Sequence, residues 1–166
     1  MKKLFSLLTL LTFAMAVAQK KNPFQDFKLL AQETHKTVSV KPGQKIDTAY
    51  FRTLFLPDAR FTVVGEENGK KSHETMGLDE FIATLSDEYY TKGFREVSKG
   101  MICDEFNGIA QVQQAFFAED SDGMNGWGVG LYHLIYSDGR WWISNMIWTM
   151  SPNGKEGIPK KLLENQ

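Results

Sequence analysis

The sequence Tyr132-His-Leu-Ile-Tyr-Ser-Asp-Gly-Arg-Trp-Trp-Ile-Ser-Asn-Met-Ile-Trp148 predicts two β-strands joined at Asp138-Gly139, near the end of this 166-residue chain. An Asp-Gly pair between apolar runs is typical of a two-residue hairpin turn, because both turn positions take positive φ angles. The turn sets the register of the two strands. The expected pairs are Ser137 with Arg140, Tyr136 with Trp141, Ile135 with Trp142, Leu134 with Ile143 and His133 with Ser144.

Strand alternation divides this hairpin into two faces, and both are rich in large apolar groups. The face expected beneath the helices carries Tyr132, Leu134, Tyr136, Trp141, Ile143, Asn145 and Ile147. The other face carries Val129, Leu131, His133, Ile135, Trp142, Ser144, Met146 and Trp148. A β-bulge would exchange part of this assignment.

The second apolar face needs a cover, because a sheet with helices on one side normally has a polar second face. A second copy of the chain is the simplest cover, so we expect a homodimer through the sheet. The expected interface residues are Leu131, Trp142, Met146 and Trp148.

Further strands precede this hairpin. From Phe94 onward the apolar period is two, and Asn107-Gly108 predicts a second hairpin turn. A strand over 109–118 follows, and a glycine-containing loop over 119–128 leads into the final hairpin.

Three helices are predicted before these strands. Asn22-Pro23 favours the start of a first short helix, and Asp47 can cap a second one that Pro57 ends. Apolar residues at helical spacing from Leu78 to Tyr89 predict a third, amphipathic helix.

Between the second and third helices, 58–64 is predicted as a short strand and the polar segment 65–72 as a surface loop. Helices followed by a long meander indicate an α+β fold. We expect three N-terminal helices packed on one face of a strongly curved antiparallel sheet.

The first residues are typical of a cleavable secretory signal. Lys2 and Lys3 precede an apolar run that ends in the small residues Ala16-Val17-Ala18. The run is shorter than the roughly 20 apolar residues of a membrane-spanning helix. Cleavage near Ala18 is expected to give a secreted or periplasmic protein without a membrane anchor.

Charge and cysteine content exclude several classes of function. The formal net charge is −1 at pH 7, so nucleic acid is not an expected partner. The single cysteine, Cys103, lies in an apolar strand pattern and is expected to be buried packing. The histidines His35, His73 and His133 are scattered, and His73-Glu74 alone lacks the spacing of a metal site. Neither a metal nor a cofactor is expected.

Three motifs together resemble the nuclear transport factor 2-like superfamily. They are Leu54-Phe-x-Pro-Asp-Ala-Arg-Phe61, Gly77-Leu-x-x-Phe81 and Asp138-Gly-Arg-Trp-x-Ile143. The chain is most similar to SnoaL-like and ketosteroid-isomerase-like bacterial members. The resemblance implies a cystatin-like cone of three helices on a bent sheet, commonly dimeric, with a central cavity. Its members include isomerases, dehydratases and ligand-binding modules without catalysis.

The resemblance divides the chain into four segments. They are a signal peptide over 1–18, an N-terminal helix and loop over 19–46, the nuclear transport factor 2-like domain over 47–150 and a C-terminal tail over 151–166.

The catalytic groups of ketosteroid isomerases are missing from this sequence. Their general base lies five residues after the Asp that matches Asp58, where this chain has Val63. Their acidic oxyanion donor aligns with Val112, which cannot donate a proton. The catalytic residues, if any, are therefore not identified by the resemblance, and Asp58 is expected to fix the turn into its strand.

The leading hypothesis is a noncatalytic binding protein for a small hydrophobic ligand, because the expected cavity is aromatic and no acid–base pair is identified. The predicted ligand-binding residues are Phe51, Phe55, Phe61, Phe81, Tyr89, Tyr132, Trp141 and Asn145. For any single one of these aromatic residues, core packing is favoured over ligand contact.

The alternative hypothesis is a lyase or isomerase for a hydrophobic carbonyl substrate, in which Tyr132 polarises an oxygen and an unidentified carboxylate moves a proton. The two hypotheses differ in what the cavity contains. A buried carboxylate within hydrogen-bond reach of a Tyr or His inside the cavity favours the enzyme hypothesis. Amides and hydroxyls alone favour the ligand-binding hypothesis.

Overall fold

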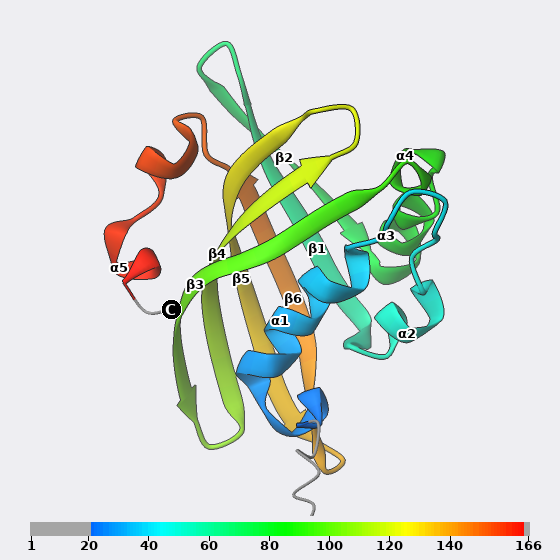
Figure 1. Ribbon diagram of the computed structural model, residues 1–166. Coiled ribbons are helices and arrows are strands. Elements are labelled where there is room, and N and C mark those ends of the chain that lie inside the picture. Colours follow the sequence, from blue (N-terminus) through cyan, green and yellow to red (C-terminus); the bar gives the residue numbers. More distant parts are fainter. Residues whose placement is uncertain (1–20, 165–166) are drawn as a thin grey trace, which may run out of the picture.

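Residues 21–164 are described by the computed structural model, in which a strongly curved six-stranded sheet wraps around one helix (Figure 1). The predicted signal peptide, 1–18, lies outside the described residues. The strands are β1 (Phe55–Glu67), β2 (Lys70–Gly77), β3 (Phe94–Phe106), β4 (Ile109–Asp120), β5 (Asn125–Ser137) and β6 (Arg140–Met150). The helices are α1 (Phe27–Val38), α2 (Thr48–Arg52), α3 (Leu78–Leu85), α4 (Glu88–Thr91) and α5 (Lys160–Leu163), with 3₁₀ turns η1 (Pro23–Gln25) and η2 (Gly154–Gly157).

The strand order is β2-β1-β6-β5-β4-β3, and the sheet is mixed. The pairs β1–β2, β3–β4, β4–β5 and β5–β6 are antiparallel, but β1 pairs parallel with β6. The prediction of an antiparallel sheet is therefore wrong for this one pair. Short hairpin turns force antiparallel pairing, whereas β1 and β6 are joined by a long connection that permits either direction.

The prediction of three helices is also wrong, because the part of the chain that the structure describes has five α-helices. The predicted third helix is split after Leu85, and the Asp87 side chain caps a new helix by accepting a hydrogen bond from the Tyr89 amide at 2.8 Å. The first helix is divided in the same way. Asn22 caps only the turn η1, and the Asp26 side chain caps α1.

The second helix ends at Arg52, before the predicted stop at Pro57, which lies inside β1. Between Phe55 and Arg60, β1 forms no pairs with β6, and the register of these two strands shifts there. Proline has no amide hydrogen to donate to a ladder, so it is tolerated in this unpaired part of the strand.

Segment 65–72, predicted as a loop, forms the end of β1, a tight turn and the start of β2. Asn68 and Gly69 have φ angles of 52° and 75°, the conformation of a two-residue hairpin turn. Charged residues on both sides of this turn, including Glu66 and Lys71, interrupt the alternation of apolar and polar residues that predicts a strand. Most of β2 is exposed, so its side chains need not be apolar.

The final hairpin follows the predicted register from Ser137–Arg140 to Leu134–Ile143 and then departs from it. His133 pairs with Asn145 rather than with Ser144, so Ser144 is the extra residue of a β-bulge. A one-residue shift turns every later β6 side chain to the other face.

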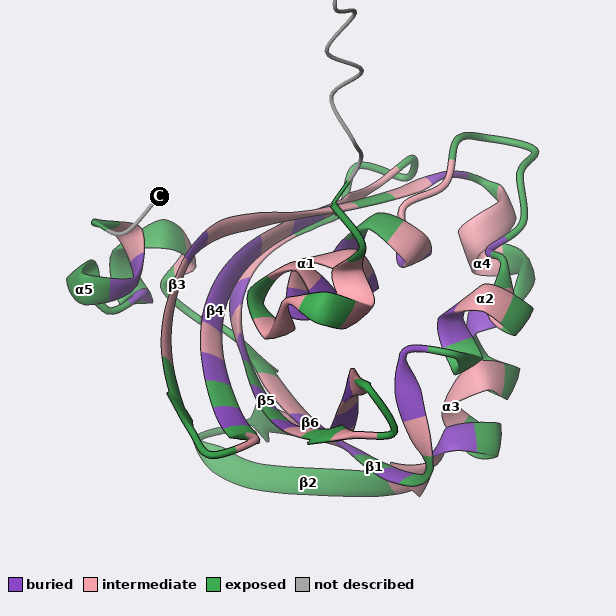
Figure 2. Cartoon of the chain, turned by 90° about the horizontal axis from the view of Figure 1, so that it is seen from below, coloured by how far each residue is buried: buried purple, intermediate pink, exposed green. Residues whose placement is uncertain are grey.

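The inner face of the sheet packs against α1, and the outer face carries the C-terminal segment. In Figure 2, α1 lies inside the curve of the sheet and α5 lies outside it, beside β3. Buried Ile158 and Leu162 cover Ala115 on the outer face. Gly100 permits this contact, because a Cβ atom there would lie 1.8 Å from the backbone oxygen of Leu162. No helix among residues 21–164 is long and apolar enough to span a membrane.

Candidate functional site

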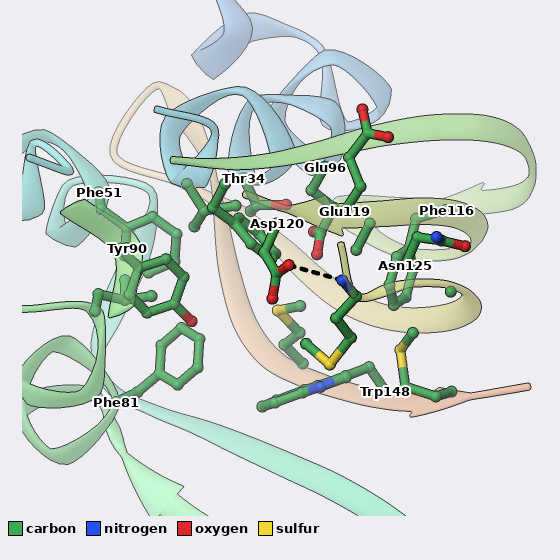
Figure 3. Close-up of a pocket in the computed structure, with 18 residues that line it drawn as sticks. Thr34, Phe51, Phe81, Tyr90, Glu96, Phe116, Glu119, Asp120, Asn125 and Trp148 are labelled. Carbon is green, nitrogen blue, oxygen red and sulfur yellow. Dashed lines mark hydrogen bonds between the residues drawn. The ribbon is translucent and has the colours of Figure 1, made fainter. Parts of the chain in front are cut away.

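A cavity of about 310 Å³ lies between α1, the short helices α2 to α4 and the inner face of β3 to β6 (Figure 3). Exposed Met124 and Met150 mark its mouth, beside the β4–β5 turn. The cavity is therefore enclosed by the cone and open at the end where the short helices meet the sheet.

The walls of the cavity are mainly aromatic. The aromatic lining residues are Phe51, Phe81, Tyr90, Phe94, Phe116 and Trp148. Phe81 stacks on buried Phe61 with ring centroids 4.3 Å apart, and Trp148 meets Phe81 edge-on at 5.6 Å. Such ring pairs hold the walls in fixed orientations, so the apolar surface is preformed.

A glycine on β5 makes room for one of these walls. A Cβ atom at position 128 would lie 2.3 Å from the Phe116 ring and 2.8 Å from the Thr149 carbonyl oxygen. The absence of a side chain at Gly128 therefore lets the Phe116 ring lie across the neighbouring strand, where it lines the cavity.

One wall of the cavity contains a chain of hydrogen bonds that begins at Glu96. Oε1 of Glu96 is hydrogen-bonded to Nδ1 of His35, and His35 Nε2 lies 3.2 Å from the Tyr132 hydroxyl. The Tyr132 hydroxyl also lies 3.2 Å from Oγ1 of Thr34, which donates to the Ala31 carbonyl at 2.8 Å. Glu96 and Thr34 reach the cavity, whereas His35 and Tyr132 are buried behind its wall.

The number of hydrogen atoms available to this series of hydrogen bonds limits the protonation states of its side chains. Because the Thr34 hydroxyl hydrogen is used by Ala31, the Tyr132 hydroxyl must donate to Thr34 if their contact is a hydrogen bond. Nε2 of His35 then carries a hydrogen and donates to Tyr132. The hydrogen bond between Glu96 and His35 therefore contains one proton, which either the carboxylate or the imidazole Nδ1 can hold. Burial also raises the pKa of Tyr132, so its hydroxyl stays protonated at neutral pH.

A tyrosine side chain also lines the cavity. Tyr90 lines it, and burial followed by the negative charge of Glu96 raises the pKa of Tyr90. Tyr90 therefore stays protonated at neutral pH and can donate a hydrogen bond to a bound molecule. Together, Glu96 and Tyr90 provide a proton acceptor and a hydrogen-bond donor in an apolar site.

Two further carboxylates lie at the mouth of the cavity. Glu119 pairs with Arg95 at 2.6 Å. Asp120 accepts hydrogen bonds from the Tyr89 hydroxyl at 2.8 Å and from the Met124 amide at 2.9 Å. The Tyr89 hydroxyl lowers the pKa of Asp120, which is therefore ionised at neutral pH.

Of the predicted ligand-binding residues, only Phe51 and Phe81 line this cavity. Phe55 and Phe61 are buried behind Phe51 and Phe81 in the core. Trp141 packs on Phe27 and is also core.

The remaining predicted residues lie elsewhere. Tyr132 is buried behind the wall, and Tyr89 bonds to Asp120 at the rim, while its neighbour Tyr90 faces the cavity. The predicted inward position of Asn145 is wrong, because the bulge at Ser144 pairs it with exposed His133 on the outer face.

The bulge also places the four predicted dimer-interface residues on two different faces of the sheet. Met146 and Trp148 line the cavity, so they lie on the inner face. Leu131 is 40% exposed on the outer face, and Trp142 stacks there on the Arg140 guanidinium at 3.7 Å. The dimer itself stays a prediction.

The candidate site residues that sequence reasoning missed are His35, Glu96, Tyr90 and Asp120. His35 does continue the apolar helical spacing of Ala31 and Val38, and that spacing could have placed it inward. Strand alternation from Phe94 places Glu96 on the same face as Phe94, and that signal could have placed Glu96 inward. Over residues 21–164, no three side chains of His, Cys, Asp or Glu come together as metal ligands.

Comparison with known proteins identifies the fold. No protein-family model and no curated protein matches the sequence. A solved nuclear transport factor 2-like protein with a cystatin-like fold from Novosphingobium aromaticivorans is similar over 82% of this chain and 86% of its own, with 12% identity and a TM-score of 0.60.

Two further solved structures agree. A cystatin-like protein of unknown function from Nostoc punctiforme matches 78% of this chain and 92% of its own, with 13% identity and a TM-score of 0.58. A candidate scytalone dehydratase from Novosphingobium aromaticivorans matches 75% of this chain and 80% of its own, with 14% identity and a TM-score of 0.53. The chain has the cystatin-like fold of nuclear transport factor 2-like proteins, as the sequence motifs predicted.

Proposed function

We propose that this chain, with its nuclear transport factor 2-like cone, binds a small and mainly apolar molecule in the cavity between α1, the short helices and the sheet. The observation that carries this proposal is the aromatic, preformed cavity of about 310 Å³. Ligand pockets are typically concave and apolar, with a few polar groups that orient the ligand. Glu96, Tyr90 and Asp120 are such groups here.

Native mass spectrometry of the protein purified from its source tests this proposal. A co-purified small molecule is expected in the wild type. Ala118→Phe places a ring into the cavity that Ala118 lines, and it should remove that molecule. Ala83→Phe is the matched control, because Ala83 is exposed on α3 and does not line the cavity.

Binding can also be measured with a neutral apolar dye, N-phenyl-1-naphthylamine. The dye should bind wild type and Ala83→Phe equally and Ala118→Phe at least about tenfold more weakly, because little free volume remains. Equal binding by all three proteins would place the dye outside the cavity and contradict the proposal.

A second candidate function is proton transfer to or from a bound carbonyl compound by a lyase or isomerase. The observation that favours it is the hydrogen bond between Glu96, which lines the cavity, and His35, which is buried behind the cavity wall. In this scheme the Glu96 carboxylate takes a proton from carbon and returns it, while the Tyr90 hydroxyl donates to the carbonyl oxygen. Tyr132, the donor expected from the sequence, is buried away from the cavity.

Deuterium uptake at the carbon next to the carbonyl of 4-phenyl-2-butanone in D₂O tests this second function. Wild type should accelerate uptake, and Glu96→Gln should reduce the acceleration by about 10²-fold or more. Glu119→Gln is the control, since Glu119 also lines the cavity but is paired with Arg95. Equal rates for wild type and Glu96→Gln would leave ligand binding as the function.

A further inference from the structure

The charged side chains that line the cavity are all negative. Its lining includes the carboxylates of Glu96, Glu119 and Asp120. None of the described lining residues is Lys, Arg or His. Any ligand in this site is therefore bound among anionic groups, and the charge that remains unbalanced decides which ligand is favoured.

Partners outside the lining balance two of these three carboxylates. Glu96 is hydrogen-bonded to the His35 imidazole and Glu119 pairs with the Arg95 guanidinium. Asp120 differs, because its hydrogen-bond partners are neutral: the Tyr89 hydroxyl on Oδ2, the Met124 amide on Oδ1 and the backbone amides of Asp122 and Gly123. The nearby ammonium of Lys92 is bonded to Asp122 instead, at 2.8 Å.

Asp120 retains the capacity to bind a ligand cation. All the donors to this carboxylate are neutral, so they leave its negative charge without a cationic partner. In Figure 3 the Asp120 carboxylate points toward the space between Tyr90 and Trp148. A cationic group there would meet one uncompensated negative charge and the faces of aromatic rings.

The aromatic walls favour the same class of ligand. Tyr and Trp ring faces attract ammonium groups by cation–π interaction, most strongly when water is excluded. Tyr90 and Trp148 both line the cavity, and so do Phe81 and Phe94. Rings around a carboxylate are a suitable environment for an organic cation, whereas a carboxylate ligand would be repelled by Asp120.

We infer that the ligand of this cavity is a hydrophobic cation, an amine or quaternary ammonium group attached to an apolar body, with Asp120 as its counter-ion. This inference rests on the proposed binding function of the cavity. The apolar body occupies the space among Phe51, Phe81 and Met146, and the cationic group lies near the mouth beside Asp120.

Three probes of one shape test the inference by isothermal titration at pH 7. They are 4-phenylbutylamine, 4-phenyl-1-butanol and 4-phenylbutyrate, which differ only in the charge of the end group. We expect the amine to bind about tenfold or more tightly than the alcohol, and the carboxylate to bind most weakly. The advantage of the amine should fall with added salt.

A pair of variants assigns the preference to one carboxylate. Asp120→Asn should reduce the advantage of the amine to less than about twofold and leave alcohol binding unchanged. Asp122→Asn is the control, because Asp122 lies two residues away, pairs with Lys92 and does not line the cavity. It should keep the full advantage.

The outcomes separate this inference from the function on which it rests. Equal binding of amine and alcohol to wild type, or tighter binding of the carboxylate, would overturn the cationic ligand and leave apolar binding intact. A preference that survives Asp120→Asn would overturn the role of Asp120. No binding of any probe would overturn both the binding function and the inference.

Discussion

Nε2 of His35 lies 3.2 Å from the hydroxyl oxygen of Tyr132, in a part of the core where both side chains are at most 2% exposed. The contact joins α1 to β5, and the other nitrogen of the same imidazole joins α1 to Glu96 on β3. One histidine therefore positions the helix across three strands and orients the carboxylate that reaches the cavity.

Tyr132→Phe should lower the free energy of unfolding by about 1–3 kcal/mol, because Nε2 of His35 is then buried without a partner. Urea denaturation measures the change. Tyr136→Phe removes a hydroxyl from a ring that is 46% exposed and should change stability by less than about 0.5 kcal/mol. Equal effects of the two variants would show that the buried network does not stabilise the fold.

The Tyr89–Asp120 hydrogen bond should make stability depend on pH at both extremes. The bond lowers the pKa of Asp120 below its ordinary value of 3.8, so its contribution is present above that pH and is lost as the pH falls. Burial, and then the same bond, raise the pKa of Tyr89 above its ordinary value of 10.0, so its contribution is lost as the pH rises beyond 10.0.

Thermal unfolding of wild type and Tyr89→Phe from acid to alkaline pH tests this dependence. The difference in melting temperature should be constant between about pH 4 and pH 10 and should shrink on both sides. Tyr136→Phe should show no such profile. A difference for Tyr89→Phe that persists unchanged into acid would mean that Asp120 is not its partner.

Gln114→Met should stabilise the protein. The Gln114 side chain is fully buried, and neither its nitrogen nor its oxygen has a hydrogen-bond partner among the described residues. Replacing an unpaired buried amide with an apolar chain of similar size should raise the free energy of unfolding by about 1–3 kcal/mol. Exposed Gln111 on the same strand provides the control variant, Gln111→Met. Destabilisation by Gln114→Met would show that the amide is satisfied in solution.

Leu131→Asp should convert the expected dimer to a monomer in light scattering without lowering the melting temperature. Leu131 and Ile109 are exposed on the outer face, and a charge there would oppose sheet-to-sheet contact. Trp148→Asp should act differently, because it puts a charge into the inner cavity wall and should lower the melting temperature. A dimer that survives Leu131→Asp would exclude this part of the face as the interface.

Local signals allowed the two predicted hairpin turns to be placed. Asn107-Gly108 and Asp138-Gly139 have positive φ angles, as two-residue turns require. The motif at 138–143, together with those at 54–61 and 77–81, predicted the cone. Asn68-Gly69 carries the same signal, but the charged residues around it obscured the strands.

The composition of the site could not be predicted, because small local shifts decide which side chains face inward. The bulge at Ser144 moves Asn145 outward and Trp148 inward, and a bulge of this kind has no reliable local signature. The break before α4 similarly turns Tyr90 rather than Tyr89 toward the cavity.

The parallel pairing of β1 with β6 constrains the order in which the chain can fold during synthesis. Until β6 has left the ribosome, the β1–β2 hairpin has no further neighbouring strand, and the apolar side chains of Ile143, Met146 and Trp148 are missing from the core. Such a non-local closing step is slow and exposes apolar surface to aggregation. The nascent chain is therefore expected to depend on a holding chaperone until its last strand is made.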